Sequence, residues 1–206
     1  MAIDVSLLDE DQLVAATAPR GPVCILAGAG TGKTRTITYR IANLVDQGVV
    51  APNKVLAVTF TQRAAGEMRD RLRRLGVGGV QARTFHSAAL RQLSFFWPQA
   101  VGGAFPGIVS GKSAIIAEAA DRAGVRLGPQ QLRKVAEQLE WRKVTEHTLD
   151  QFGEEFASGR RPNETGLPAE QLHELAVQYE RAKEARQQLD FEDVLLATAG
   201  MLESEP

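Results

Sequence analysis

The residues from Ala27 to Thr34, with the sequence AGAGTGKT, constrain this chain more than any other segment. Small residues let the backbone curve so that several N–H groups point inward, which is an arrangement that binds phosphate. The apolar run Val23–Ala27 before it predicts a buried strand, and Lys33–Asp46 after it predicts a helix. A strand, a glycine-rich turn, Gly-Lys-Thr and a helix in this order predict a phosphate-binding loop.

The two residues at the end of this loop have distinct expected roles. Lys33 is expected to reach the β- and γ-phosphates of a nucleotide, and the Thr34 hydroxyl is expected to bind Mg²⁺. Ala27 stands where the strict pattern has glycine, and alanine is also small. The alternative is a glycine turn that precedes a helix by chance, which the coincidence of all four features disfavours.

The order of the remaining elements predicts the fold class. Val55–Thr59 and Gln81–Phe85 indicate two more strands, and Thr61–Leu75 between them indicates an arginine-rich helix that ends at Gly76. Strands that alternate with helices predict an α/β domain with a parallel sheet and right-handed crossovers. After about Ser87 only helices are expected: Ser113–Ala123, Pro129–Val144, Leu149–Ala157, Ala169–Gln188 and Phe191–Leu202.

Composition narrows the class of protein. Hydrophobic residues make up 44% and charged residues 24% of the 206, as in ordinary globular proteins. No apolar run approaches the ~20 residues that a membrane helix needs, and the N-terminus does not resemble a signal peptide, so a cytoplasmic protein is expected.

Charge is unevenly distributed along the chain. Residues 1–110 hold 12 Lys and Arg against 7 Asp and Glu, whereas residues 111–206 hold 12 Lys and Arg against 18 Asp and Glu. Arg63–Arg91 is the most basic stretch, and it predicts either a solvated helix face or a phosphate-binding patch.

Five segments together resemble the UvrD/Rep/PcrA-type superfamily 1 DNA helicases. The N-terminal LDEDQ resembles the Q-motif of that family, AGAGTGKT its motif I, VLAVTFTQRAAGEM its motif Ia, RTFHS its TFHS motif, and LDFEDVLL its DFxDLL segment. In this chain they occupy Leu8–Gln12, Ala27–Thr34, Val55–Met68, Arg83–Ser87 and Leu189–Leu196. Their order is also that of the family.

The resemblance implies a P-loop (RecA-like) motor domain, called 1A, with an all-helical domain 1B inserted in it. Residues 1–88 are then the first part of 1A, residues 89–188 are 1B, and residues 189–206 begin the return to 1A. The implied activity is 3′-to-5′ translocation on single-stranded DNA driven by ATP hydrolysis, with unwinding at single-strand–duplex junctions, in DNA repair. ATP and Mg²⁺ are the implied cofactors.

The resemblance also implies the site residues. For the nucleotide they are Gln12, Ala27, Gly28, Ala29, Gly30, Thr31, Gly32, Lys33, Thr34, Arg35 and Arg71, with Lys33 and Thr34 as the catalytic pair and Thr34 on the metal. For single-stranded DNA they are Phe60, Thr61, Gln62, Arg63, Thr84, Phe85 and His86. An aromatic ring suits such a site because it stacks on any base.

Several of these residues have a structural alternative. Gln12 is expected to read adenine but also has capping-box spacing from Asp9. Arg35 is expected to stack on adenine or to lie exposed at a helix start. Phe60 is expected to contact DNA or to belong to the core. A histidine such as His86 is often structural, and Arg69, Arg71, Arg73 and Arg74 are more often a solvated face.

Other conspicuous residues are expected to be structural. Ser94–Trp97 resembles a base-stacking platform, but core packing is the preferred interpretation, as it is for Trp141. Asp190, Glu192 and Asp193 resemble a metal site, but the family uses this segment for packing. His147 and His173 lack ligand partners at useful spacing. Cys24, the only cysteine, is expected to be inert in a buried strand.

The chain lacks the DExx box (Walker B) and the later motifs of the family. We therefore expect the N-terminal part of a helicase that needs its further motor domains for hydrolysis, with an incomplete sheet whose edge at Val23–Ala27 exposes apolar residues. A freestanding nucleotide- or DNA-binding module is the alternative. A kinase-like P-loop enzyme is disfavoured by the DNA-facing motifs.

Overall fold

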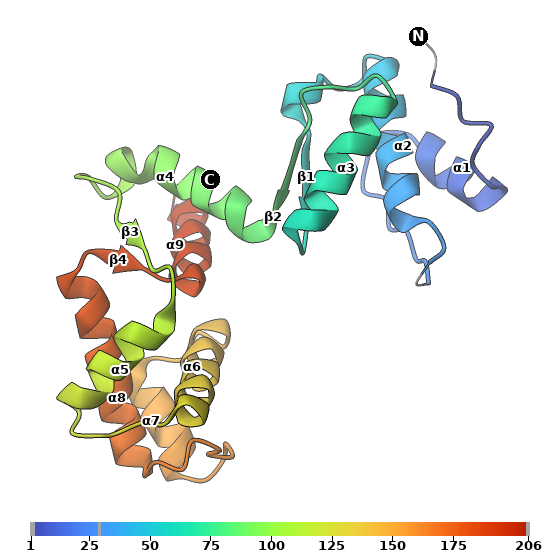
Figure 1. Ribbon diagram of the computed structural model, residues 1–206. Coiled ribbons are helices and arrows are strands. Elements are labelled where there is room, and N and C mark those ends of the chain that lie inside the picture. The colour runs from blue at the N-terminus through green and yellow to red at the C-terminus, as the bar shows by residue number, and fades with distance from the viewer. Residues whose placement is uncertain (1–2, 29, 205–206) are drawn as a thin grey trace. The chain divides into compact units, whose positions relative to one another are not determined.

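The computed structural model describes residues 3–28 and 30–204. The chain divides into two compact units, unit 1 with residues 1–88 and unit 2 with residues 89–206 (Figure 1). The division falls within the helix α4 (Phe85–Ala100), so that its first residues belong to unit 1. The sequence patterns did not predict α4 as a helix.

Unit 1 is a small α/β unit. Before α4 its elements are α1 (Glu10–Thr17), α2 (Lys33–Asp46), the 3₁₀ turn η1 (Pro52–Lys54), β1 (Leu56–Thr59), α3 (Gln62–Arg74) and β2 (Gln81–Thr84). The two strands run parallel, with Leu56 opposite Gln81, and α3 connects them as predicted. One face of this pair packs against α3, and its buried cluster comprises Ala57, Met68, Leu72 and Ala82.

The predicted strand at Val23–Ala27 is wrong. The segment lies outside both sheets of the described residues, each of which has two strands. A strand needs hydrogen bonds to a neighbour, and β1 forms its ladder with β2. Leu26 is 93% exposed and Cys24 is exposed, so Cys24 is not the buried core residue that the sequence predicted. The expected exposure of apolar side chains in this segment is nevertheless present.

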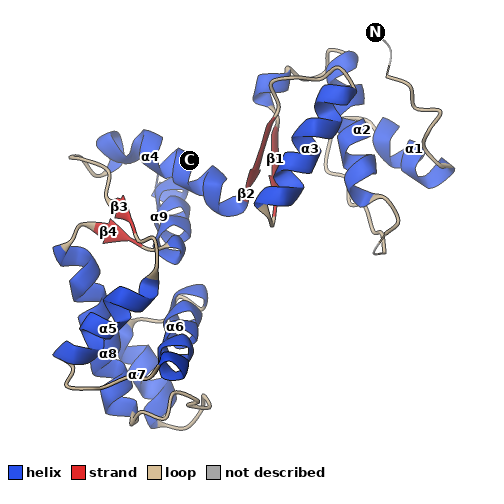
Figure 2. Cartoon of the chain, in the orientation of Figure 1, coloured by secondary structure: helices blue, strands red, loops and turns tan. Residues whose placement is uncertain are grey.

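Unit 2 is almost entirely helical (Figure 2). After α4 it contains β3 (Gly107–Ile108), α5 (Lys112–Arg122), α6 (Pro129–Val144), α7 (Leu149–Ala157), α8 (Ala169–Ala185), β4 (Gln188–Leu189) and α9 (Phe191–Ser204). The five helices from α5 to α9 match the predicted ones to within a few residues. The short parallel pair β3–β4 corrects the expectation that no strand follows Ser87.

The core of unit 2 lies among α5, α6, α7 and α8. Large side chains that are almost fully buried there include Ile116, Leu139, Phe152, Leu172 and Tyr179. Apolar positions on each helix meet there, which is the usual way that amphipathic helices gain stability. The helix α9 packs within this unit and lies beside α4 and α6 in the part of the chain that follows residue 88.

Candidate functional site

The glycine-rich loop turns sharply into α2. Gly30 and Gly32 have φ values of 80° and 87°, a conformation that favours glycine because it has no Cβ. The Thr31 hydroxyl donates to the carbonyl of Gly28 at 2.9 Å and closes the turn. Ala29, one of the predicted nucleotide residues, lies outside the described residues. The loop therefore leads directly into the N-terminus of α2, where the helix dipole favours an anion.

Lys33 and Thr34 occupy the first turn of α2. The Lys33 ammonium donates to the carbonyls of Ala27 and Gly28 at 2.8 Å and 2.6 Å. Its positive charge is therefore held over the same loop whose backbone is expected to surround phosphate. Thr34 is half-buried beside it. These positions suit the roles that the sequence predicted for both residues, a charge for phosphate and a hydroxyl ligand for Mg²⁺.

Gln12 reaches this loop from α1. Its backbone N–H donates to the Asp9 carboxylate at 2.8 Å, so Asp9 is the N-cap of α1. The Gln12 side chain donates to the carbonyl of Thr31 at 3.1 Å instead of completing a capping box. The Asp9 cap at the start of α1 is therefore present without a reciprocal contact from the Gln12 side chain, and the reading of adenine by Gln12 stays a prediction.

Arg35 and Arg71 come from different helices and line one pocket. The pocket has a volume of about 260 Å³, and its lining comprises Arg35, Thr38, Tyr39, Arg71, Arg74 and Leu75. The Arg35 guanidinium lies 5.9 Å from the centre of the Tyr39 ring and donates to the carbonyl of Leu7. The structure thus brings together two residues that the sequence assigned to the nucleotide.

Tyr39 was not among the predicted site residues, whereas Arg74 was expected on a solvated face and is exposed, although it also lines this pocket. Tyr39 follows Arg35 by four residues and Arg74 follows Arg71 by three, so each pair shares a helix face. This spacing was visible in the sequence, and it would have suggested both residues.

Two aromatic rings mark the carboxyl ends of the two parallel strands. Phe60 follows β1 and Phe85 follows β2, and their ring centres lie 5.9 Å apart at an interplanar angle of 51°. Phe60 is 94% exposed and Phe85 is 52% exposed. The alternative that Phe60 is a core residue is therefore wrong. Exposed, adjacent rings are suited to stacking with nucleic acid bases.

The other predicted DNA residues surround this pair with different exposures. Thr61 is the N-cap of α3, where its hydroxyl accepts from the Ala64 N–H at 3.1 Å, and Gln62 is exposed beside it. The exposed Arg63 pairs with Glu67 at 3.0 Å. At the other strand, His86 is exposed in the first turn of α4.

Thr84 lies inside the fold. It is buried, and its hydroxyl lies 2.9 Å from that of Ser87. The Thr84 side chain therefore organises the start of α4, and Phe85 and His86 present the exposed side chains of this motif.

The arginines of α3 divide into structural and exposed groups. Arg69 donates to the carbonyl of Ala82 at 2.6 Å and so ties α3 to β2. Arg73 pairs with Asp70 at 3.2 Å on the surface. Arg71 and Arg74 line the pocket described above. The expectation of a solvated face therefore holds for Arg73 and fails for Arg69.

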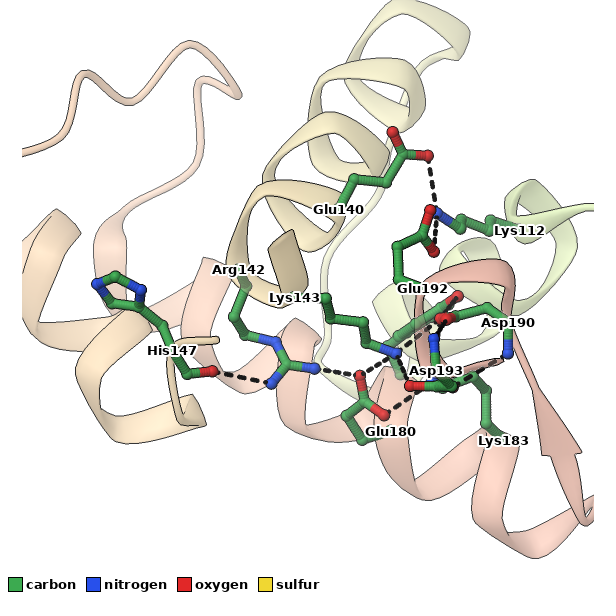
Figure 3. A network of polar contacts seen from close by, with 11 residues as sticks. Lys112, Glu140, Arg142, Lys143, His147, Glu180, Lys183, Asp190, Glu192 and Asp193 are labelled. Carbon is green, nitrogen blue, oxygen red and sulfur yellow. Dashed lines mark hydrogen bonds and ion pairs between the residues drawn. The ribbon is translucent and has the colours of Figure 1, made fainter. Parts of the chain in front are cut away.

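The acidic residues near the end of the chain are paired with lysines (Figure 3). Lys143 donates to Asp190 and Asp193 at 2.7 Å and 2.5 Å, and Lys183 donates to Asp190 at 3.0 Å. Glu192 pairs with Lys112 at 2.7 Å. Within residues 3–28 and 30–204, no group of three or more His, Cys, Asp or Glu side chains is arranged to hold a metal ion. Asp190, Glu192 and Asp193 are therefore acceptors in a network of ion pairs with lysines of α5, α6 and α8.

Aromatic residues of unit 2 have mixed environments. Trp141 packs on the core, and the Arg161 guanidinium lies 3.8 Å from the centre of its ring. Trp97 is half-buried and contacts Phe105 edge-on at 5.5 Å. Phe95 is 68% exposed, so core packing of Ser94–Trp97 is wrong for Phe95.

No helix in the described part of the chain has the length and apolarity required to cross a membrane.

Comparison with known proteins places these motifs in a family. A profile described as "UvrD/REP helicase N-terminal domain" matches residues 8–206. The chain is 46% identical over 209 residues to "ATP-dependent DNA helicase UvrD2" of Mycobacterium tuberculosis (strain ATCC 25618 / H37Rv), which covers 96% of this chain and 30% of the relative.

Two further relatives match a shorter stretch. "DNA helicase II" of Rickettsia typhi is 48% identical over 87 residues, covering 42% of this chain and 13% of the relative. "ATP-dependent DNA helicase PcrA" of Staphylococcus aureus (strain Mu50 / ATCC 700699) is 46% identical over 90 residues, covering 42% and 12%. The chain thus spans about 30% of the length of its mycobacterial relatives. Because the family profile matches nearly all of the chain, the protein belongs to the UvrD/REP helicase N-terminal domain family.

Proposed function

We propose that this chain is the ATP- and single-stranded-DNA-binding part of a UvrD-like helicase that moves 3′ to 5′, unwinds DNA and acts in repair. The observation that carries the proposal is the convergence of Gln12, Lys33 and Thr34 at the start of α2. Two of the relatives are named as ATP-dependent DNA helicases, which supports the same activity.

The nucleotide is proposed to lie along the loop and to extend toward the pocket of Arg35 and Arg71. Lys33 and the amides of the first turn of α2 bind its phosphates, and Gln12 and Arg35 bind its base. Ala27, Gly28, Gly30, Thr31 and Gly32 are proposed to line this phosphate site. Mg²⁺, held by Thr34, supplies charge neutralisation on the phosphates when bound.

Single-stranded DNA is proposed to run along the carboxyl ends of β1 and β2. Phe60 and Phe85 stack on bases there, and Arg63 binds a phosphate. Thr61, Gln62 and His86 line the same track, and Thr84 supports it. Stacking suits a motor because it is insensitive to sequence.

The domain assignment follows the proposed motor. Residues 1–88 form the first part of domain 1A, residues 89–188 form domain 1B, and residues 189–206 lead back toward 1A. The further motor domains are proposed as partners that supply the carboxylates for Mg²⁺ and for activation of water. Junctions of single and double strands are the proposed substrate, in the cytoplasm.

ATP turnover by the 206-residue chain, with and without single-stranded DNA, tests this dependence, with Lys33→Ala as the control. The proposal predicts negligible turnover by both proteins under both conditions. DNA-stimulated turnover that Lys33→Ala abolishes would show that the chain completes its own site, and the dependence on further motor domains would be wrong.

A further inference from the structure

The helix α1, which carries Gln12, has few apolar contacts of its own. It has eight residues, and helices shorter than about 12 residues are marginally stable in isolation. Ala16 is its only buried residue, whereas Leu13 and Val14 are exposed. Polar contacts must therefore contribute much of what holds α1 against α2.

Arg40 of α2 provides most of these polar contacts. Its Nη1 donates to the carbonyls of Ala15 and Ala18 at 3.2 Å and 2.6 Å, and its Nη2 donates to the carbonyl of Pro19 at 3.0 Å. The last carbonyls of a helix have no partners within the helix, and a cation there also interacts favourably with the helix dipole. Arg40 thus caps α1 from outside.

The shape of the guanidinium group matters for this contact. Its planar fork presents several donors in fixed directions, whereas a lysine ammonium is a single point of charge. Asn43, one turn further along α2, adds a longer hydrogen bond from its Nδ2 to the carbonyl of Ala16 at 3.4 Å. The two side chains together hold the C-terminal end of α1.

The first half of α1 reaches the glycine-rich loop through Gln12. Gln12 lies about one turn before Ala15 and Ala16, and its side chain donates to the carbonyl of Thr31. Since α1 is only about two turns long, the hydrogen bonds that hold its C-terminal end against α2 also determine where Gln12 lies. Arg40 therefore determines where Gln12 meets the loop. Arg40 itself lies away from the loop, seven residues after Lys33 on α2.

We propose that Arg40 is a positioning residue for the nucleotide, which sets the affinity and selectivity for adenine by holding α1 and Gln12 against the loop. This inference rests on the proposed function, in which Gln12 binds the base. Arg40 does not touch the nucleotide in this arrangement. Its loss is therefore expected to affect recognition of the base and to leave binding of the phosphate chain unchanged.

Equilibrium binding of Mg-ATP, Mg-GTP and inorganic tripolyphosphate to the full 206-residue chain tests this inference. Four variants are compared with the original protein: Arg40→Ala, Arg40→Lys, Gln12→Ala and Arg20→Ala. Arg20 is an exposed arginine directly after Pro19, so Arg20→Ala removes an equal charge without removing the hydrogen bonds of Arg40. Circular dichroism confirms that each variant is folded, and Arg40→Lys serves if Arg40→Ala is not.

Arg40→Ala is expected to weaken ATP binding about tenfold, because Gln12 then loses its position and with it a hydrogen bond to the base. It should lower the ratio of ATP to GTP affinity as Gln12→Ala does, and it should leave the affinity for tripolyphosphate unchanged. Arg20→Ala should bind all three ligands as the original protein does. Arg40→Lys should resemble Arg40→Ala. A combined Gln12→Ala and Arg40→Ala variant should lose no more than either alone.

Two results would overturn the inference. One is an equal loss of ATP and tripolyphosphate binding in Arg40→Ala, which indicates general damage to the unit. The other is an unchanged ATP-to-GTP ratio in Arg40→Ala while Gln12→Ala lowers it. Failure of the original protein to bind either ATP or tripolyphosphate would instead contradict the proposed function itself, and the inference with it.

Discussion

Lys143 donates a hydrogen bond to Asp190 at 2.7 Å, and both side chains are almost fully buried although 47 residues separate them in the chain. Lys183 donates to the same carboxylate oxygen at 3.0 Å, as does the Tyr179 hydroxyl. Helices α6 and α8 thereby hold the start of α9. A buried ion pair is weak evidence for net stability, but removal of one partner leaves an uncompensated charge.

Asp190→Asn is expected to destabilise unit 2 by about 3 kcal/mol, because two buried ammonium groups lose a shared acceptor charge. Urea denaturation followed by circular dichroism measures this as a lower midpoint. Asp121→Asn, at an exposed position on α5, is the matched control and should change stability by less than about 0.5 kcal/mol. Equal effects of the two substitutions would show that the ion network does not stabilise the unit.

The same ion network predicts that the stability of unit 2 decreases at acidic pH. Burial tends to raise the pKa of Asp190, but the ammonium groups of Lys143 and Lys183 outweigh it and hold that pKa well below its usual range. A carboxyl of this kind stabilises the fold above its unfolded pKa of about 3.9, and the stabilisation is lost as the pH falls through the folded pKa. The free energy of unfolding should therefore decrease below about pH 4. Urea titrations from pH 2 to 7 measure it, and the decrease should be smaller in Asp190→Asn.

Gly32→Ala should weaken ATP binding more than Gly30→Ala does. Both positions have positive φ, so each substitution costs about 1–2 kcal/mol of backbone strain. At Gly32 the added Cβ would also lie 2.8 Å from the Gln12 Nε2, whereas at Gly30 it meets nothing within 4 Å. The end of the Gln12 side chain must then shift from its place beside the Thr31 carbonyl. Addition of Gln12→Ala should weaken ATP binding further in Gly30→Ala but little in Gly32→Ala, and an equal further loss in both would contradict this contact.

Phe60→Ala should weaken single-stranded DNA binding, since one stacked base contributes about 1–3 kcal/mol. Because Phe60 is exposed, the substitution should leave thermal stability unchanged. Fluorescence anisotropy with a labelled oligothymidylate measures the affinity. Phe60→Trp should retain it, and Val144→Ala, at an exposed apolar position of unit 2, is the control. An unchanged affinity in Phe60→Ala would remove this ring from the proposed DNA track.

Local patterns predicted the elements that depend on local physics. The helices of unit 2 and the unit β1–α3–β2 follow from periodicity and caps, such as Thr61 at the start of α3. The strand expected at Val23–Ala27 failed because an apolar run shows only a tendency, and a strand also requires a neighbour. No pattern in one segment can provide that neighbour.

Side-chain environments were harder to predict than elements. The convergence of Arg35 with Arg71 depends on how α2 and α3 pack, and the burial of Thr84 depends on its contact with Ser87. The role of Arg69 was missed for the same reason, since its partner is the carbonyl of Ala82 on β2. The pairs Arg35–Tyr39 and Arg71–Arg74, in contrast, were accessible from helical spacing alone.

The binding of Mg-ATP to the 206-residue chain and to its Lys33→Ala variant, measured by isothermal titration calorimetry, tests the central claim most directly. The Lys33 ammonium donates to the loop carbonyls of Ala27 and Gly28 and is exposed, so its removal should leave the fold intact. The account predicts measurable binding by the original chain and a loss of at least about tenfold in Lys33→Ala, because a charge-assisted contact to phosphate is removed. Equal binding by the two proteins, or no binding by the original chain, would contradict it.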